Sequence, residues 1–479
     1  MATNQTTPLQ GWTSSPNGRG TVDILSGSGI TLFLCSWSVL CLNIYPPGYG
    51  VYKKAWRKFE LAGLCFLGPE FIFQLAVGQW CAARRSVAEF DRLKYPGWSM
   101  THAFFANMGG FVLQAQMSPT LGEDFPTFPL DSKQVLYLVE NGYVPYSAVG
   151  IEKEEIEDKD KVDGVVRLII VCQIFWYLVC CISRLVQHLD VTVIELATVG
   201  FIICSMGTYF FWREKPMDVN RAIILRPNST LEEILCEAGE CASEPYRRTP
   251  MDFVGREEWS WTLYWTYWKG VMRKSGFNFD RTERPIDKIP NDDFPLINGK
   301  PMWILFVFQM GYGAVHLTGW RLPFPTHTEK KLWHIATITI MICITLTWVV
   351  EVYAWRIPSR LGRTDSGFTA EKAPPSTLDI ARPTRTPSPI PSSSCTIDRS
   401  RGSAANDRLK RIAARLRNNT NPHDPVMDVP LRTLVPVTLC GGIYVFARCY
   451  VIIEGFINLR ALPPSAYESV NWTAFLPHF

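Results

Sequence analysis

The amino-acid sequence predicts an all-α protein, a polytopic membrane bundle of about seven transmembrane helices. Hydrophobic residues make up 47% of the 479-residue chain, and they gather into seven long blocks with very few charges. The charged residues, 19% of the chain, crowd into the segments between these blocks. A transmembrane helix needs about 20 predominantly apolar residues, which is close to the length of each block. This uneven distribution argues against a single soluble core.

The seven blocks give the predicted spans, and aromatic residues mark many of their ends, as expected at membrane interfaces. The spans are Ile24–Tyr45, Phe59–Ala82, Leu168–Gln187, Val191–Trp212, Met302–Trp320, Trp333–Trp355 and Leu434–Leu459. Seven crossings would place the two termini on opposite faces. Residues 1–23 are a polar leader without a small-residue cleavage pattern, so we expect the first span to be an uncleaved anchor.

The connections between the spans alternate in length. Short links follow the first, third and fifth spans, at 46–58, 188–190 and 321–332. Each crossing takes the chain to the other face, so after an even number of crossings it returns to the face of the N-terminus. The long links follow the second, fourth and sixth spans, they include 83–167 and 213–301, and they would therefore share that face. Lys and Arg are more frequent near the span ends on that face, which favours the cytosol for the long links and the N-terminus.

The last long link separates the membrane bundle, residues 24–363, from the final span and tail, residues 431–479. Within residues 364–430, the run Thr364–Ser403 is rich in Ser, Thr and Pro and is predicted to be disordered. Residues 405–417 follow as a basic amphipathic helix, with Leu409, Ile412 and Leu416 on one face. Periodicity fits an anionic membrane surface and a solvated helix packed on the protein equally well.

Several segments of the chain have distinctive sequences beyond their apolar composition: Thr101–Phe111, Glu157–Lys161, Phe210–Val219, Tyr312–His316, Phe324–Thr326 with Leu332 and Trp333, Arg448–Glu454 and Phe475–Phe479. In these segments the chain resembles a large family of uncharacterised fungal multi-pass integral membrane proteins. The resemblance implies a multi-pass helical architecture and a fungal origin. It implies no particular activity and assigns no catalytic residue.

Two ionisable residues fall near the middle of predicted spans. Arg448 and Glu70 lie too far from the span ends to reach the surface easily, so we expect an ion pair between the second and seventh spans. Ionisable residues at this depth are candidates for ligand binding. The alternative is a structural pair that fixes helix packing.

A second set of polar residues is expected to lie toward the face of the short links. The set comprises Glu60, Arg184, Glu195, His316 and Glu454, each within about two turns of that face when span directions alternate. Together they could line a vestibule with a titratable imidazole. Ordinary polarity of helix ends is the alternative, because snorkelling is inexpensive there.

Other types of site receive no support from the sequence. The 14 cysteines lie mostly inside apolar blocks, and the histidines show no metal-ligand spacing, so we predict neither a metal nor a cofactor. The net charge of +4 and the lack of long basic runs argue against nucleic-acid binding.

The lipid bilayer is the expected partner of such an integral membrane protein. The sequence leaves three functions open. The first is binding or transport of a small or amphipathic molecule. The second is an intramembrane enzyme acting on a lipid or isoprenoid-like substrate, with His316 as general base. The third is a seven-helix receptor, for which the number of spans is the only argument.

Overall fold

The computed structural model describes residues 9–14, 18–116, 125–158, 164–219, 221–243, 246–255, 260–275, 284–297, 299–356 and 431–472. These residues are mostly helical, with three short strands. The Ser/Thr/Pro-rich run Thr364–Ser403, the basic segment 405–417 and the tail Phe475–Phe479 lie outside the described residues.

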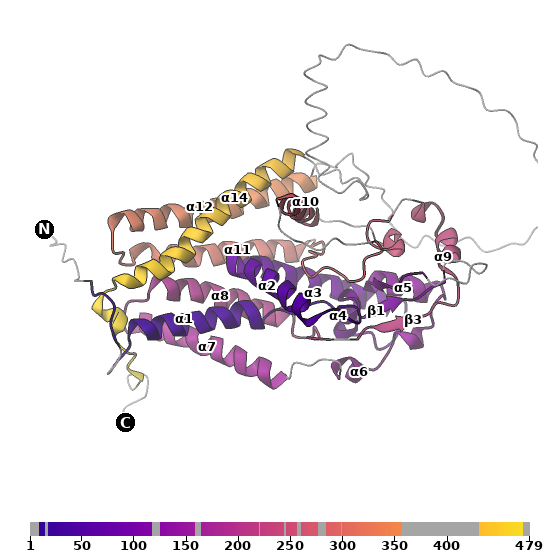
Figure 1. Ribbon diagram of the computed structural model, residues 1–479, viewed down its shortest axis with the longest axis horizontal. Helices are drawn as coiled ribbons and strands as arrows, with labels where there is room; N and C mark the ends of the chain where they lie inside the picture. Colours follow the sequence, from indigo (N-terminus) through magenta and orange to yellow (C-terminus); the bar gives the residue numbers. More distant parts are fainter. Residues whose placement is uncertain are drawn as a thin grey trace, which may run out of the picture.

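Long helices lie side by side along the long axis of the molecule and form a bundle (Figure 1). They are α1 (Thr21–Phe33) with its π-helical continuation η1 (Leu34–Ser38), α7 (Gly164–Val186), α8 (Val193–Phe211), α11 (Lys300–Thr318), α12 (His327–Arg356) and α14 (Leu431–Ile457). Four stretches are long and apolar enough to cross a membrane, namely Val165–Val186, Val193–Phe211, His327–Val352 and Leu431–Arg460. The helical fold class is therefore confirmed, with four apolar stretches of spanning length.

The second predicted span, Phe59–Ala82, is not one continuous helix. It is divided between α2 (Val51–Leu67) and α3 (Pro69–Arg92), which bend by 112° relative to each other. Between them Gly68 has an extended backbone, with φ −158° and ψ 92°. The cause is local: a proline lacks an N–H and disfavours the helical conformation in the residue before it.

The α2–α3 pair is a hairpin that enters and leaves the bundle at the same end. Just before α2, the Ile44 N–H donates to the Met108 carbonyl, which follows α3 in the chain, at 3.0 Å. The tip of the hairpin at Gly68 lies inside the bundle instead, because Arg448 of α14 donates to the Leu67 carbonyl at 3.1 Å. We call the end where the hairpin opens the long-link end.

Both described chain ends lie at the opposite, terminal end of the bundle (Figure 1). Gln10 forms a β-bridge with Leu462 there, and Arg19 forms an ion pair with Glu195 at the start of α8. This arrangement corrects the expectation that the termini lie on opposite faces and that the N-terminus shares a face with the long links. The physical reason is the hairpin, which turns back where one further crossing was predicted.

The long links fold into a separate layer at the long-link end (Figure 1). Its helices are α4 (Met100–Asn107), α5 (Ser132–Glu140), α6 (Lys153–Glu157) and α9 (Leu231–Ala238), and α10 (Ser260–Lys274) lies against α14. A three-stranded sheet has the order β2–β1–β3, from β1 (Phe111–Leu113), β2 (Phe128–Leu130) and β3 (Ile223–Leu225). Strand β1 pairs antiparallel with β2, with Phe111 opposite Leu130, and parallel with β3, with Phe111 opposite Ile223.

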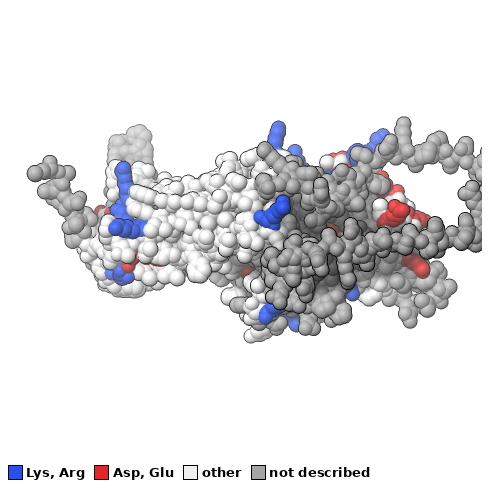
Figure 2. Space-filling view, turned by 90° about the horizontal axis from the view of Figure 1, so that it is seen from above, with Lys and Arg blue, Asp and Glu red and all other residues white. Residues whose placement is uncertain are grey.

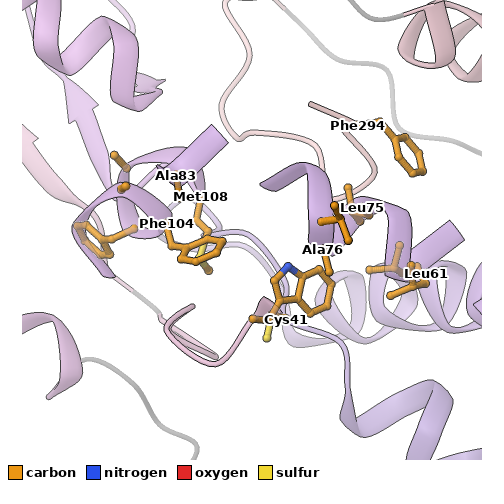
Figure 3. Packing of buried hydrophobic residues seen from close by; sticks show 14 of the residues in the cluster. Cys41, Leu61, Leu75, Ala76, Ala83, Phe104, Met108 and Phe294 are labelled. Carbon is orange, nitrogen blue, oxygen red and sulfur yellow. The ribbon is translucent and has the colours of Figure 1, made fainter. Parts of the chain in front are cut away.

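Buried apolar side chains form one main cluster that runs from the bundle into this layer. Figure 3 shows part of it, with Leu61 of α2 near Leu75 of α3 on one side, and Phe104 and Met108 near Ala83 on the other. The shared core holds the hairpin and the layer together, because burial of apolar surface stabilises both.

The surface between the two ends carries few charges. Figure 2 shows Lys and Arg side chains at the terminal end and again farther along the molecule, with an almost uncharged stretch of bundle surface between them. Large apolar side chains such as Phe446 (82% exposed) and Val307 (68% exposed) point outward from the bundle helices. A belt of this kind is typical of a surface that faces lipid.

Candidate functional site

The break between α2 and α3 frees a backbone carbonyl inside the bundle. The Phe71 N–H donates to the Gly68 carbonyl at 3.0 Å rather than to Leu67 four residues earlier. The Leu67 carbonyl is therefore available, and Nε of Arg448 donates to it. A Cβ added at Gly68 would lie 2.6 Å from the Phe71 ring, so the turn needs a glycine at this point.

Arg448 lies in the interior of the bundle and is 1% exposed. Its Nη1 is 2.7 Å from Nε2 of His316 on α11. A guanidinium only donates hydrogen bonds, so Nε2 of His316 is the acceptor and the ring proton sits on Nδ1, 3.3 Å from the Tyr312 carbonyl. The guanidinium also lies over the rings of Phe201 and Tyr312, at 5.3 Å and 5.4 Å from their centroids. These contacts stabilise its positive charge away from water.

Glu70 lies in the first turn of α3 and is 2% exposed. The Tyr444 hydroxyl donates to its Oε1. Because Tyr444 precedes Arg448 by four residues, one face of α14 presents both side chains to the hairpin tip. Glu70 and Arg448 also interact electrostatically. The positive end of the α3 dipole favours a carboxylate at this position.

We define the central cluster as Glu70, Tyr312, His316, Tyr444 and Arg448. Three of its polar atoms are buried without a hydrogen-bond partner among the described residues: Oε2 of Glu70, the Tyr312 hydroxyl and Nη2 of Arg448. Each such atom costs about 1–3 kcal/mol when it is left unpaired in the interior. Unpaired polar atoms that persist in a fold are typical of sites that take up another group.

The geometry corrects the expected direct ion pair between Glu70 and Arg448. No salt bridge joins them in the described part of the chain; Arg448 instead donates to His316 and to the Leu67 carbonyl, while Glu70 accepts from Tyr444. The two residues do lie in one cluster, as the sequence suggested. The partners of Arg448 come from the hairpin tip and from α11, and the partner of Glu70 comes from α14, an arrangement that the sequence did not predict.

The five residues of the expected polar layer do not share one site. Only His316 joins the central cluster. Arg184 is 3% exposed and binds backbone carbonyls of the C-terminal segment, with Nη1 at 2.7 Å from the Glu468 carbonyl and Nη2 at 3.0 Å from that of Ala466. It also donates to the Asp190 carbonyl at 2.9 Å, so its guanidinium fastens the C-terminal segment to the end of α7.

Glu195 has a capping role at the start of α8. Its Oε2 accepts from the Thr192 N–H at 2.9 Å, and its own N–H donates to the Thr192 hydroxyl, which is a capping box. Arg19 binds its other oxygen. The side chain therefore satisfies a helix end and ties the N-terminal segment to the bundle.

Glu454 and Glu60 lie apart from the central cluster and from the contacts that Arg184 and Glu195 make. Glu454 accepts from Tyr450 at 3.2 Å, one turn away on α14. Glu60 pairs with Arg57 at 2.6 Å and accepts from Trp56 at 2.9 Å, all on α2. Because α2 starts at the long-link end, Glu60 cannot belong to a layer near the terminal end.

A chain of polar side chains continues from the central cluster toward the long-link end. Gln74 lies one turn beyond Glu70 on α3, and its Oε1 accepts from Gln309 of α11 at 3.0 Å. Oε1 of Gln309 accepts from the Trp348 indole of α12 at 2.6 Å. Both glutamines are at most 5% exposed, so an interior polar track joins three helices.

A buried lysine lies just beyond the end of α8. Lys215 is 2% exposed, and its Nζ donates to Gln79 at 2.8 Å and to the Cys41 carbonyl at 3.1 Å. The ammonium also lies 4.5 Å from the ring centroid of Trp212. Burial lowers the pKa of Lys215 from 10.5 to about 8, because a charged ammonium is poorly solvated there.

His102 lies on α4, in the layer at the long-link end. Its ring nitrogens lie 2.8 Å from the Ser99 hydroxyl and 2.7 Å from the Ile151 carbonyl. Burial lowers the pKa of His102, and both nitrogens are occupied by structural contacts.

Sequence reasoning did not single out Tyr312, Tyr444 or Gln309 as polar groups of the interior. Tyr312 and His316, like Tyr444 and Arg448, are separated by four residues, a spacing that places both members on one helix face. The Gly68–Pro69 pair was the signal for the hairpin. Among the described residues, no group of three or more His, Cys, Asp or Glu side chains could hold a metal ion.

A family model described as a family of unknown function (DUF8562) matches residues 1–244 and 413–479. The match includes the hairpin with Glu70 and the helix α14 with Arg448, whereas α10, α11 and α12 lie outside it. Neither the curated proteins nor the solved structures contain a match to the chain. The chain thus belongs to DUF8562, a family of unknown function.

Proposed function

We propose that the protein is a multi-pass integral membrane protein that binds and carries a small or amphipathic molecule at the central cluster. The observation that supports this proposal most directly is the broken helix pair α2–α3, whose tip meets buried, incompletely paired Glu70 and Arg448. Helices interrupted at mid-depth, with ionisable side chains at the break, are typical of substrate sites in membrane transporters.

The proposed arrangement in the membrane has six crossings and one re-entrant hairpin, in place of the seven crossings suggested by the sequence. The crossings are α1 with η1, α7, α8, α11, α12 and α14. Four of them contain stretches of spanning length and composition, and the uncharged belt in Figure 2 supports a lipid-facing surface. An even number of crossings agrees with chain ends that meet at one end of the bundle.

The orientation we propose has the long-link end in the cytosol and both chain ends on the other side. The start of α2 adds Lys53, Lys54, Arg57 and Lys58 to the long-link end, where the sequence already places most other basic residues that flank spans. With the re-entrant hairpin, more of the Lys and Arg residues lie on the cytosolic side than with seven crossings, so this arrangement agrees better with the positive-inside rule.

The polar track offers a route between the central cluster and the long-link end. Gln74 lies one turn from Glu70 on α3, and it is linked through Gln309 to Trp348 by hydrogen bonds of 3.0 Å and 2.6 Å. Polar side chains that line a path through an apolar bundle lower the cost of moving a polar solute.

An intramembrane enzyme with His316 as general base receives less support from the geometry. Nε2 of His316 accepts from Arg448, and Nδ1 faces the Tyr312 carbonyl, so both ring nitrogens are occupied. A general base needs a free lone pair within reach of the proton it removes. Binding and transport therefore remain the better explanation.

The proposal can be tested by comparing a deletion strain complemented with wild-type protein, with Arg448→Met or with Arg432→Gln. Arg432 is an exposed arginine on the same helix and serves as the matched control. We expect cellular metabolite profiles to return to normal with wild type and Arg432→Gln, and to stay altered with Arg448→Met at equal expression. Full rescue by a folded Arg448→Met protein would argue against a role for the central cluster.

A further inference from the structure

The charges of the central cluster constrain what it can bind. Arg448 is permanently cationic, and it is buried. His316 is neutral in this geometry, since its Nε2 accepts a hydrogen bond from the guanidinium. Glu70 is the carboxylate of the cluster, and the Tyr312 and Tyr444 hydroxyls are uncharged at ordinary pH. The net charge of the cluster therefore depends on whether Glu70 holds a proton.

The groups that face Glu70 come from each helix around it. They are Tyr444 and Arg448 on α14, Tyr312 on α11, Cys65 on α2 and Cys204 on α8, with His316 next to Arg448. Among these groups, only Arg448 carries a full charge at neutral pH. With ionised Glu70 the cluster is neutral, and with protonated Glu70 it has a charge of +1.

The unpaired atoms indicate which chemical group would complete the cluster. Nη2 of Arg448 and the Tyr312 hydroxyl are two buried donors without a partner among the described residues, and they belong to side chains in contact, since the guanidinium carbon lies 5.4 Å from the centroid of the Tyr312 ring. A carboxylate offers two acceptor oxygens and one negative charge. It would balance a cluster with one cation and a protonated Glu70, whereas a doubly charged phosphate would leave an unbalanced charge in the interior.

We propose that the central cluster takes up a small monocarboxylate together with one proton, the carboxylate on Arg448 and Tyr312 and the proton on Glu70. This inference rests on the proposed function. The empty cluster, with cationic Arg448 and ionised Glu70, is electrically neutral. It remains neutral after uptake, because the proton neutralises Glu70 and the carboxylate balances Arg448. The proton comes from water and binds Glu70 without any covalent change in the solute. Tyr444, which donates to ionised Glu70, can rotate its hydroxyl to accept from the protonated carboxyl.

The test uses the full chain in liposomes with radiolabelled lactate, glycerol and choline as probes, and protein-free liposomes as the leak control. We expect uptake of lactate alone, faster at lower outside pH, with one proton entering per lactate as measured by an internal pH dye. Uptake of glycerol or choline, or of lactate without a proton, would overturn the inference but leave transport in place. Uptake of none of the probes would contradict the transport role and the inference together.

Variants of Glu70 separate the proton site from the anion site. Glu70→Gln imitates the protonated carboxyl, so lactate uptake should persist, lose its dependence on pH and carry no proton. The matched control is Glu454→Gln, which changes a buried carboxylate on α14 outside the central cluster and should keep the pH dependence. A Glu70→Gln protein with unchanged proton coupling would refute the assignment.

Tyr312→Phe provides a second test if substitutions of Arg448 prevent folding. It removes one donor but retains the ring beneath the guanidinium. We expect the half-saturating lactate concentration to rise roughly tenfold, as for loss of one hydrogen bond to a charged group, with the proton ratio unchanged. An unchanged half-saturating concentration would exclude the Tyr312 hydroxyl as a ligand.

Discussion

Arg448 of α14 and His316 of α11 form a direct contact across the bundle interior, with Nη1 of the arginine 2.7 Å from Nε2 of the histidine. His316 is fully buried, and Arg448 is 1% exposed. Neither side chain can exchange its partner for water, so the bond fixes the tautomer of the imidazole and the orientation of the guanidinium. The hairpin tip completes the arrangement, because the Leu67 carbonyl accepts from the same guanidinium.

Removing the imidazole should destabilise the fold. In His316→Phe, Nη1 of Arg448 loses its acceptor in a buried position, and we expect a loss of about 1–3 kcal/mol in the free energy of unfolding. His316→Gln keeps an acceptor oxygen and should lose less. Thermal unfolding of the two variants in detergent measures the difference. Equal unfolding midpoints for wild type and His316→Phe would show that the contact contributes nothing to stability.

The hairpin turn should tolerate no side chain at Gly68. A Cβ there would lie 2.6 Å from the Phe71 ring, so Gly68→Ala should lower the free energy of unfolding by about 1–3 kcal/mol through overpacking. Gly63, within α2, is the matched control, because a Cβ added there meets nothing within 4 Å. Gly63→Ala should be neutral or stabilising by up to about 1 kcal/mol. The prediction is wrong if both alanine variants unfold at the same temperature.

The proposed orientation can be read from native cysteines. Cys236 and Cys241 are exposed in the layer at the long-link end, so they should resist membrane-impermeant thiol reagents in intact cells and react after permeabilisation. A cysteine introduced by Glu468→Cys near the C-terminal end should react in intact cells. The opposite labelling pattern would reverse the orientation, and labelling of all three positions from outside would contradict the arrangement of the crossings.

The sequence predicted the bundle helices well because apolar blocks of spanning length are a local property. Composition could not reveal whether the block Phe59–Ala82 crosses or turns back, since both paths bury a similar set of apolar residues. The Gly68–Pro69 pair contains the local reason for the turn, but its direction depends on packing against α14. In the proposed arrangement with a re-entrant hairpin, the N-terminus and the link 46–58 each lie on the face opposite to the one expected from seven crossings.

The candidate site was predictable only in part. Glu70, His316 and Arg448 stood out as ionisable residues in apolar blocks, and the structure brings these three into one cluster. Their partners could not be found from spacing alone, because the Leu67 carbonyl and Arg448 are hundreds of positions apart in the chain and meet through the fold. Arg184 and Glu195 also stand out for their charge, but Arg184 binds backbone carbonyls of the C-terminal segment and Glu195 caps the start of α8.

Lys215 gives the protein a specific pH dependence of stability. The pKa of Lys215 is lowered from 10.5 to about 8 by burial, so between these values the unfolded chain still holds a proton that the folded protein has released. Stability therefore rises with pH across this interval, by an amount on the order of 3 kcal/mol for this residue. Below about pH 8 the lysine is charged in both states, and the cost of burying the charge is present in full.

The variant Lys215→Met isolates this contribution, because methionine fills a similar volume and does not titrate. At each pH the variant also lacks the bonds to Gln79 and Cys41, so the informative quantity is the change in the difference between the two proteins. As pH rises from about 8 to 10.5, wild type should gain stability relative to Lys215→Met. Unfolding midpoints in detergent across this series provide the measurement. A difference that stays constant would mean that Lys215 has an ordinary pKa and that its charge is stabilised by Gln79 and Trp212 as well as by water.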